Sequence, residues 1–169
     1  IVSLEAIFLS IVVLISQNRA ARIDDLREEI DLQINTIAEE EITKMRESGR
    51  INAMALSAAR DAVRPGITTA ELNAIAEEVI RKHGGIPTFL GYPGAYPFPA
   101  TLTISINEEL VHGIPGKRKL NDGDIVSIDC GTTFEGFVGD SAITVGVGEI
   151  SQEARRLLEV TENSLYEGI

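Results

Sequence analysis

The chain of 169 residues has one cysteine, no tryptophan and few basic side chains, and each shortage narrows its function. Because Cys130 has no second cysteine to pair with, an internal disulfide is excluded and a reducing compartment is expected. Acidic residues outnumber basic ones by 26 to 15, and the net charge of -11 argues against nucleic acid as a partner. The 44% of hydrophobic residues is ample for the core of one domain with a small addition.

Residues 1–16 are apolar on all sides, apart from Glu5 and three serines. A helix of this length measures about 24 Å at ~1.5 Å per residue, slightly less than the ~30 Å of hydrocarbon in a bilayer. Arg19, Arg22 and Arg27 follow the run, and basic residues beside an apolar helix indicate its cytoplasmic end. We therefore expect a membrane-derived helix, with a buried core helix as the alternative.

Residues 20–41 are predicted to form an acidic amphipathic helix, because apolar residues recur at spacings of three and four: Ile23, Leu26, Ile30 and Ile34. The segments Ser3–Ser10, Ile15–Arg19 and Asp31–Asn35 together resemble the tail of an uncharacterised family of small bacterial membrane proteins with two adjacent transmembrane helices. This resemblance covers residues 1–44 and implies a membrane origin but no chemistry.

From Glu41 onward the pattern is that of a soluble α/β (α+β) domain, so we divide the chain into residues 1–40 and 41–169. One helix is expected to run to about Val63, before a Pro-Gly pair. Thr68 and Glu71 have the spacing of a capping box, which begins a second helix. We then predict a loop at 90–100, strands at 101–106, 124–130 and 137–147, and a helix after Ser151.

Asp129 and Asp140 fall on two antiparallel strands that a turn near Phe134 and Glu135 would join. Opposed or diagonal residues of such a pair lie ~4.5–8 Å apart, so the two carboxylates could share one cation or two. Carboxylates completed by a histidine suit Mn²⁺, Fe²⁺, Co²⁺ or Zn²⁺, and two such ions polarise a bridging water in hydrolytic sites. The alternative is structural, with one aspartate capping a strand and the other in a Gly-Asp turn.

His112 lies in a loop after a strand, where Pro115-Gly116 enforces a turn. A loop histidine is commonly solvated, but beside a metal pair it could donate a proton or bind a substrate amide. We interpret His83 as structural, because an imidazolium at a helix C-terminus complements the helix dipole. Cys130 has no basic partner nearby in the sequence, so we interpret its thiol as inert.

Eight segments that follow one another along residues 41–169 support one further resemblance. They are Glu41–Arg50, Val63–Leu72, Leu90–Gly94, Ser105–Glu109, Val111–Gly116, Gly123–Gly131, Gly139–Ser141 and Glu153–Leu158. Together they resemble the first half of bacterial type I methionine aminopeptidase, a family of peptidase class M24. Prolidase-like relatives share the fold and the aspartates but not the segments Leu90–Gly94 and Val111–Gly116. The resemblance implies half of a pita-bread fold, which consists of two pseudo-related α/β halves.

The resemblance also implies a cytoplasmic, monomeric metallo-aminopeptidase that removes the initiator methionine from nascent chains, at the ribosome. Asp129 and Asp140 would be the first two ligands of two divalent metal ions (Co, Mn, Fe or Zn), with Asp140 bridging both. His112 would contact the scissile amide and stabilise the intermediate. The residues that would bind the methionine side chain or lie near it are Tyr92, Phe89, Phe98 and Thr103.

The chain departs from that family in three ways. The remaining ligands of the family, one histidine and two glutamates, belong to a second half that this sequence does not contain, so we predict no aminopeptidase activity for the 169 residues alone. The loop Gly91–Pro99 is about three residues longer than usual in the family, so the wall that it forms in the methionine pocket is expected to differ. The family normally begins near Glu41, without a membrane helix.

Both resemblances pass through residues 38–45 without a linker, whereas natural fusions usually insert a polar spacer. The chain also begins at Ile1 instead of a methionine and ends at Ile169 within a predicted helix, so we expect both ends to be cut. These features indicate a chimeric or fragmentary sequence. The functional alternative is a membrane-tethered, non-catalytic binding module that is attached through residues 1–16.

Overall fold

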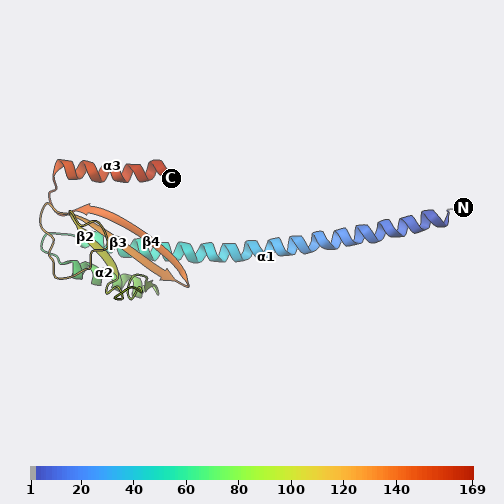
Figure 1. Cartoon of the computed structure of the whole chain (residues 1–169), viewed down its shortest axis with the longest axis horizontal. Helices are drawn as coiled ribbons and strands as arrows, with labels where there is room; N and C mark the ends of the chain where they lie inside the picture. Colours follow the sequence, from blue (N-terminus) through green and yellow to red (C-terminus); the bar gives the residue numbers. More distant parts are fainter. Residues whose placement is uncertain (1–2) are drawn as a thin grey trace. The chain divides into compact units, whose positions relative to one another are not determined.

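The computed structural model describes residues 3–169, and the chain divides into two compact units, Ile1–Ile42 and Thr43–Ile169 (Figure 1). One helix, α1 (Leu4–Ala62), replaces the three separate helices that we expected between residues 1 and 63. No proline or glycine lies between Leu4 and Ser48, so nothing in this stretch interrupts the helical hydrogen bonds. Gly49 is the first glycine of the chain, and α1 continues through it to Ala62.

The first unit consists of helix with exposed side chains wherever the structure describes them. Its apolar residues are no exception, since Leu9 is 64% and Ile15 56% exposed. Within residues 3–169, the structure contains no helix whose length and hydropathy are sufficient to cross a membrane. The predicted membrane-derived helix at 1–16 is therefore not confirmed, and its first two residues lie outside the described part of the chain.

The second unit contains an antiparallel sheet in which β3 is the central strand. It pairs along its whole length with β4 and, on its other edge, with β1 and then β2. The strands are β1 (Ile86–Pro87), β2 (Leu102–Ile106), β3 (Ile125–Phe134) and β4 (Phe137–Gly146). The three strands predicted at 101–106, 124–130 and 137–147 are present, while the short β1 was not predicted.

A two-residue turn joins β3 to β4 and sets their register. Glu135 and Gly136 both have positive φ, 47° and 88°, as a hairpin turn of the I′ type requires. Phe134 consequently pairs with Phe137, and every later pair follows from this one.

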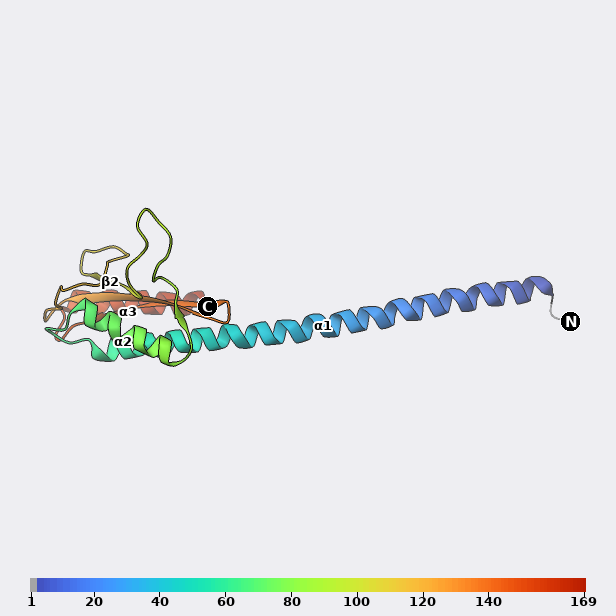
Figure 2. The same cartoon turned by 90° about the horizontal axis from the view of Figure 1, so that it is seen from below.

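Two helices cover one face of the sheet in the second unit, α2 (Thr69–Lys82) and the last turns of α1 (Figures 1 and 2). The expected capping box of Thr68 and Glu71 is present at the start of α2, and His83 ends it. The core consists of buried side chains from these helices and from β2 and β3, chiefly Ile51, Ala55, Leu72, Ala76, Ile80, Leu102, Ile104, Ile106, Val126 and Ile128. The last helix, α3 (Gln152–Gly168), has the predicted Ser151 cap and no buried residue.

Candidate functional site

Asp129 and Asp140 are diagonal neighbours on the sheet face opposite the core. Asp129 pairs with Ala142, and Gly131, two residues further along β3, pairs with Asp140. Because side chains alternate along a strand, Asp129 shares its face with these residues, while Ile128 and Cys130 point into the core. The structure therefore brings together the two carboxylates that the sequence placed on a hairpin.

The environment of Asp129 disfavours its negative charge. Burial is the largest cause that raises the pKa of this carboxyl, followed by the charge of Asp140 and a hydrogen bond with it. The backbone N–H of Cys130 and the charge of His112 act in the opposite direction. Two carboxylates in this arrangement repel each other unless a cation lies between them.

Hydroxyl groups and one aromatic ring surround the carboxylate pair. Thr103 on β2 pairs directly with Asp129, and next to it the Ser127 and Thr144 hydroxyls lie 2.8 Å apart. On the other side, a Cβ added to Gly131 would lie 2.7 Å from Cε1 of Phe89, so that ring covers the glycine opposite Asp140. The absence of a side chain at Gly131 allows an apolar wall to form beside two charged groups.

His112 has an unusual backbone conformation and precedes a glycine that is bonded to β2. Its φ is 59°, in the left-handed region that a histidine adopts at some cost in energy. The next residue, Gly113, lies against β2, where its carbonyl accepts from the Ile104 N–H at 2.8 Å and its own N–H donates to the Ser105 hydroxyl at 3.3 Å. This contact holds the His112 loop beside the strand that carries Thr103, and the charge of His112 acts on Asp129.

The loop with Tyr92 and Phe98 is closed by its own backbone. The Gly91 N–H donates to the Phe98 carbonyl at 2.8 Å, the Phe98 N–H donates to the Tyr92 carbonyl at 3.0 Å, and the Tyr92 N–H donates to Phe89. Tyr92 is 63% exposed and Phe98 half-buried, whereas Phe89 lies against β3 at Gly131. Figure 2 shows this loop on the side of the sheet away from α2.

A buried polar network behind the pair was not predicted. The Asn52 side chain in α1 donates to the Ser141 hydroxyl at 2.8 Å and accepts from the Thr132 hydroxyl at 3.0 Å, while the Ser48 hydroxyl donates to the Thr132 carbonyl at 2.7 Å. These bonds connect α1 to Ser141, next to Asp140 on β4, and to Thr132, which pairs with Gly139 on the other side of Asp140. The signal in the sequence was two polar residues at i and i+4 on the buried side of a helix.

Comparison with known proteins places the second unit in a family. The family model described as metallopeptidase family M24 matches residues 43–169. The chain belongs to metallopeptidase family M24. A second model, described as a protein of unknown function (DUF1003), matches residues 1–63, so the two matches overlap within α1.

Relatives of this M24 chain are methionine aminopeptidases. That of Clostridium perfringens is 53% identical over 131 residues, which are 78% of this chain and 51% of the relative, and methionine aminopeptidase 1 of Bacillus subtilis is 53% identical over 129 residues, 76% and 51%. The crystal structure of methionine aminopeptidase from Rickettsia prowazekii has a TM-score of 0.73 at 37% identity, over 78% of this chain and 52% of that one. The chain spans about half the length of the curated relatives it matches.

Membership of a metallopeptidase family implies a divalent metal ion, and the carboxylate pair fits one. Two close carboxylates offer the hard oxygen donors that such ions prefer, and the raised pKa of Asp129 reflects a negative charge that a cation would neutralise. Over the described residues, no group of three or more His, Cys, Asp and Glu side chains is placed to hold a metal ion. The M24 chain thus contributes two strong donors, with His112 close by.

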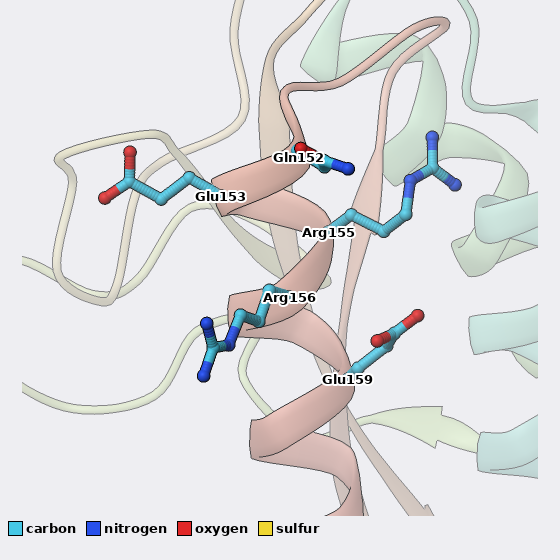
Figure 3. Close-up of a pocket in the computed structure, with 5 residues that line it drawn as sticks. All are labelled: Gln152, Glu153, Arg155, Arg156 and Glu159. Carbon is cyan, nitrogen blue, oxygen red and sulfur yellow. The ribbon is translucent and has the colours of Figure 1, made fainter.

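Two other features of the M24 chain lie outside this site. Cys130 points into the core, where burial raises the pKa of its thiol to about 12, so no thiolate forms at neutral pH. A hollow on α3 is lined by charged and polar side chains, namely Gln152, Glu153, Arg155, Arg156 and Glu159 (Figure 3). Its acidic and basic groups are interspersed along one helix, and none of them comes from the strands of the carboxylate pair.

Proposed function

We propose that residues 41–169 provide half of the active site of a metal-dependent aminopeptidase that removes the N-terminal methionine from nascent proteins. The observation that carries this proposal is the diagonal placement of Asp129 and Asp140 on the sheet face opposite the core, where the charge of Asp140 acts on the carboxyl of Asp129. The family match and the names of the relatives support the reaction and the substrate.

In this proposal the carboxylates of Asp129 and Asp140 would hold two divalent ions, Co²⁺, Mn²⁺, Fe²⁺ or Zn²⁺, and Asp140 would be a ligand of both. A divalent ion bound there supplies Lewis acidity and an activated water. His112 precedes Gly113, whose backbone is bonded to β2, and we expect the His112 ring to donate a hydrogen bond to the scissile amide. Pre-organisation of this loop reduces the cost of ordering the histidine when a substrate binds.

The methionine side chain would contact the aromatic residues beside the pair. Phe89 provides an apolar wall over Gly131, and Tyr92 is connected to it through a backbone hydrogen bond. Thr103 and Phe98 would complete this part of the pocket from β2 and from the closed loop. The cytoplasm is the proposed location, since the substrate is a newly made chain.

Two protein ligands are too few to bind a catalytic metal ion tightly. Catalytic metal ions commonly have three or more protein ligands, so the 169-residue chain alone is expected to bind Mn²⁺ weakly and to cleave no Met-peptide. The membrane-tethered module remains a less supported alternative, because no described feature points to its ligand.

The test is calorimetric titration of the full chain with Mn²⁺. We expect a weak heat signal that either Asp129→Asn or Asp140→Asn abolishes, while Glu108→Gln, at an exposed carboxylate of the β2–β3 connection, leaves it unchanged. Equal binding by wild type and both aspartate variants would contradict the proposal. Turnover of a Met-peptide that Asp129→Ala abolishes would show instead that the chain is complete enough to act alone.

A further inference from the structure

The N-terminal part of α1 carries an apolar stripe that is exposed to solvent. Five residues follow one another at spacings of three, four, four and three, which places them on one face of the helix. Each is between 51% and 58% exposed: Ile23, Leu26, Ile30, Ile34 and Ile37. Five large aliphatic side chains in one line are a continuous apolar surface, and such surfaces mark sites of association.

The spacing of the stripe is symmetric about Ile30. Leu26 and Ile34 lie four residues before and after it, and Ile23 and Ile37 lie seven residues before and after it. A stripe that reads the same in both directions is self-complementary under a two-fold axis through Ile30. In an antiparallel pair of copies, Ile23 would meet Ile37, Leu26 would meet Ile34, and Ile30 would meet itself.

Charged residues distinguish an antiparallel from a parallel pair. Arg19 and Glu41 lie eleven residues before and after Ile30, in line with the stripe. Within one helix they are about 33 Å apart at ~1.5 Å per residue, so they cannot pair in one chain. In an antiparallel pair, each Arg19 would meet Glu41 of the second copy at both ends of the stripe.

The other charged residues of this segment also favour an antiparallel pair. Residues 19–27 contain three arginines and two aspartates, whereas residues 31–41 contain four carboxylates and no basic residue. A parallel pair would bring the two acidic segments together, which costs energy through like-charge repulsion. An antiparallel pair places each acidic segment against the segment that contains the arginines.

We propose that residues 19–41 of α1 bind the same residues of a second copy of this chain, as an antiparallel helix pair centred on Ile30. This replaces the monomer that we expected from the sequence. The proposal does not depend on the metal site, because all its residues lie in the first unit.

Sedimentation equilibrium of the full chain tests the proposal directly. At about 100 µM protein, we expect the mass of a dimer. Ile30→Lys places two lysines against each other on the two-fold axis and should weaken the dimer by about tenfold or more. Leu32→Lys is the matched control, because Leu32 is 68% exposed but lies off the stripe, and this variant should remain dimeric.

Charge reversal tests the orientation. Arg19→Glu and Glu41→Arg should each weaken the dimer several-fold at low salt, and the double variant should recover the loss, because only an antiparallel pair brings these positions together. A wild-type monomer at this concentration, a dimer unaffected by Ile30→Lys, or a double variant without recovery would overturn the proposal. So would a monomer that floats with phosphatidylcholine–phosphatidylglycerol vesicles, since the stripe would then bind a membrane surface.

Discussion

Asp140 lies diagonally across the β3–β4 pair from Asp129, opposite Gly131, and its charge raises the pKa of the Asp129 carboxyl in addition to burial. This relationship follows from the turn at Glu135 and Gly136, because a shift of one residue would turn one of the two carboxylates to the other face of the sheet. The hairpin thus concentrates negative charge at one place, and the first prediction concerns the cost of that charge.

Replacement of Asp140 by asparagine removes the charge that faces Asp129. Burial chiefly raises the pKa of Asp129, and the charge and hydrogen bond of Asp140 raise it further. A carboxyl with a raised pKa in the folded chain destabilises the fold above that pKa, and this penalty disappears below the ordinary aspartate pKa. In metal-free buffer at neutral pH, Asp140→Asn should increase the free energy of unfolding by about 0.5–1 kcal/mol, a small amount because water screens the site.

Urea unfolding in EDTA at several pH values measures this effect. The gain in the free energy of unfolding of Asp140→Asn should shrink as the pH falls through the raised pKa of Asp129. It should vanish below pH ~3.9, the ordinary pKa of aspartate. Asp61→Asn, which removes an exposed ion pair with Arg60, is the control and should lack this pH dependence. A gain that stays constant with pH would exclude carboxylate repulsion as its cause.

Asn52 should act as a positioning residue for the hairpin through Thr132 and Ser141. Asn52→Ala leaves the buried Thr132 hydroxyl without its partner, so we expect a loss of about 1–3 kcal/mol in the free energy of unfolding. Thr132→Val removes one of the same bonds. The two changes should be non-additive by about 0.5–3 kcal/mol in a double-mutant cycle of urea unfolding. Simple additivity would mean that Asn52 and Thr132 are energetically independent.

Asn52→Ala should also weaken Mn²⁺ binding if the proposed metal site is correct, because β4 would lose its connection to α1 beside Asp140. Asn52→Ser, which replaces the amide by a hydroxyl group that can still donate and accept a hydrogen bond, should recover part of the affinity. Calorimetric titration of both variants measures this. If stability falls while the affinity for Mn²⁺ is unchanged, Asn52 supports the fold and does not position the aspartates.

Gly113→Ala should release the His112 loop from β2. A Cβ at this position would lie only 2.1 Å from the Ile104 carbonyl oxygen, so the loop must move and its hydrogen bond to Ile104 must weaken. We expect a loss of about 1–3 kcal/mol and faster hydrogen exchange at the Ile104 amide. Gly116→Ala is the matched control, because its nearest contact would be at 4.0 Å. Equal effects at the two glycines would contradict this account of the loop.

Local patterns were sufficient to predict the hairpin and the two aspartates on it. Alternation predicted β2, an apolar run predicted β3, and the predicted turn near Phe134 and Glu135 joined β3 to β4, since these signals act between neighbours in the chain. The capping box at Thr68 was predictable for the same reason. A tight turn between two strands then leaves little choice about which residues face each other.

Features that depend on contacts distant in the sequence were missed or misjudged. The α1 helix was divided into three because its apolar pattern changes along its length, although no residue before Gly49 breaks it. The two-residue β1 strand exists only through its pairing with Thr132 and Thr133. The partners of Asn52 lie 80 and 89 residues away, and no local pattern identifies them.

Two glycines that touch, Gly49 in α1 and Gly139 in β4, should respond to alanine in opposite ways. A Cβ on Gly139 would lie 2.8 Å from the Gly49 backbone, which cannot move aside as a flexible side chain would, so Gly139→Ala should cost about 1–3 kcal/mol. A Cβ on Gly49 meets nothing within 4 Å, and alanine favours a helix over glycine, so Gly49→Ala should gain about 0.5–1 kcal/mol. Urea unfolding of both variants measures the two effects. A loss of stability in Gly49→Ala would mean that α1 lies closer to β4 than described, and that the hairpin with Asp140 is held differently.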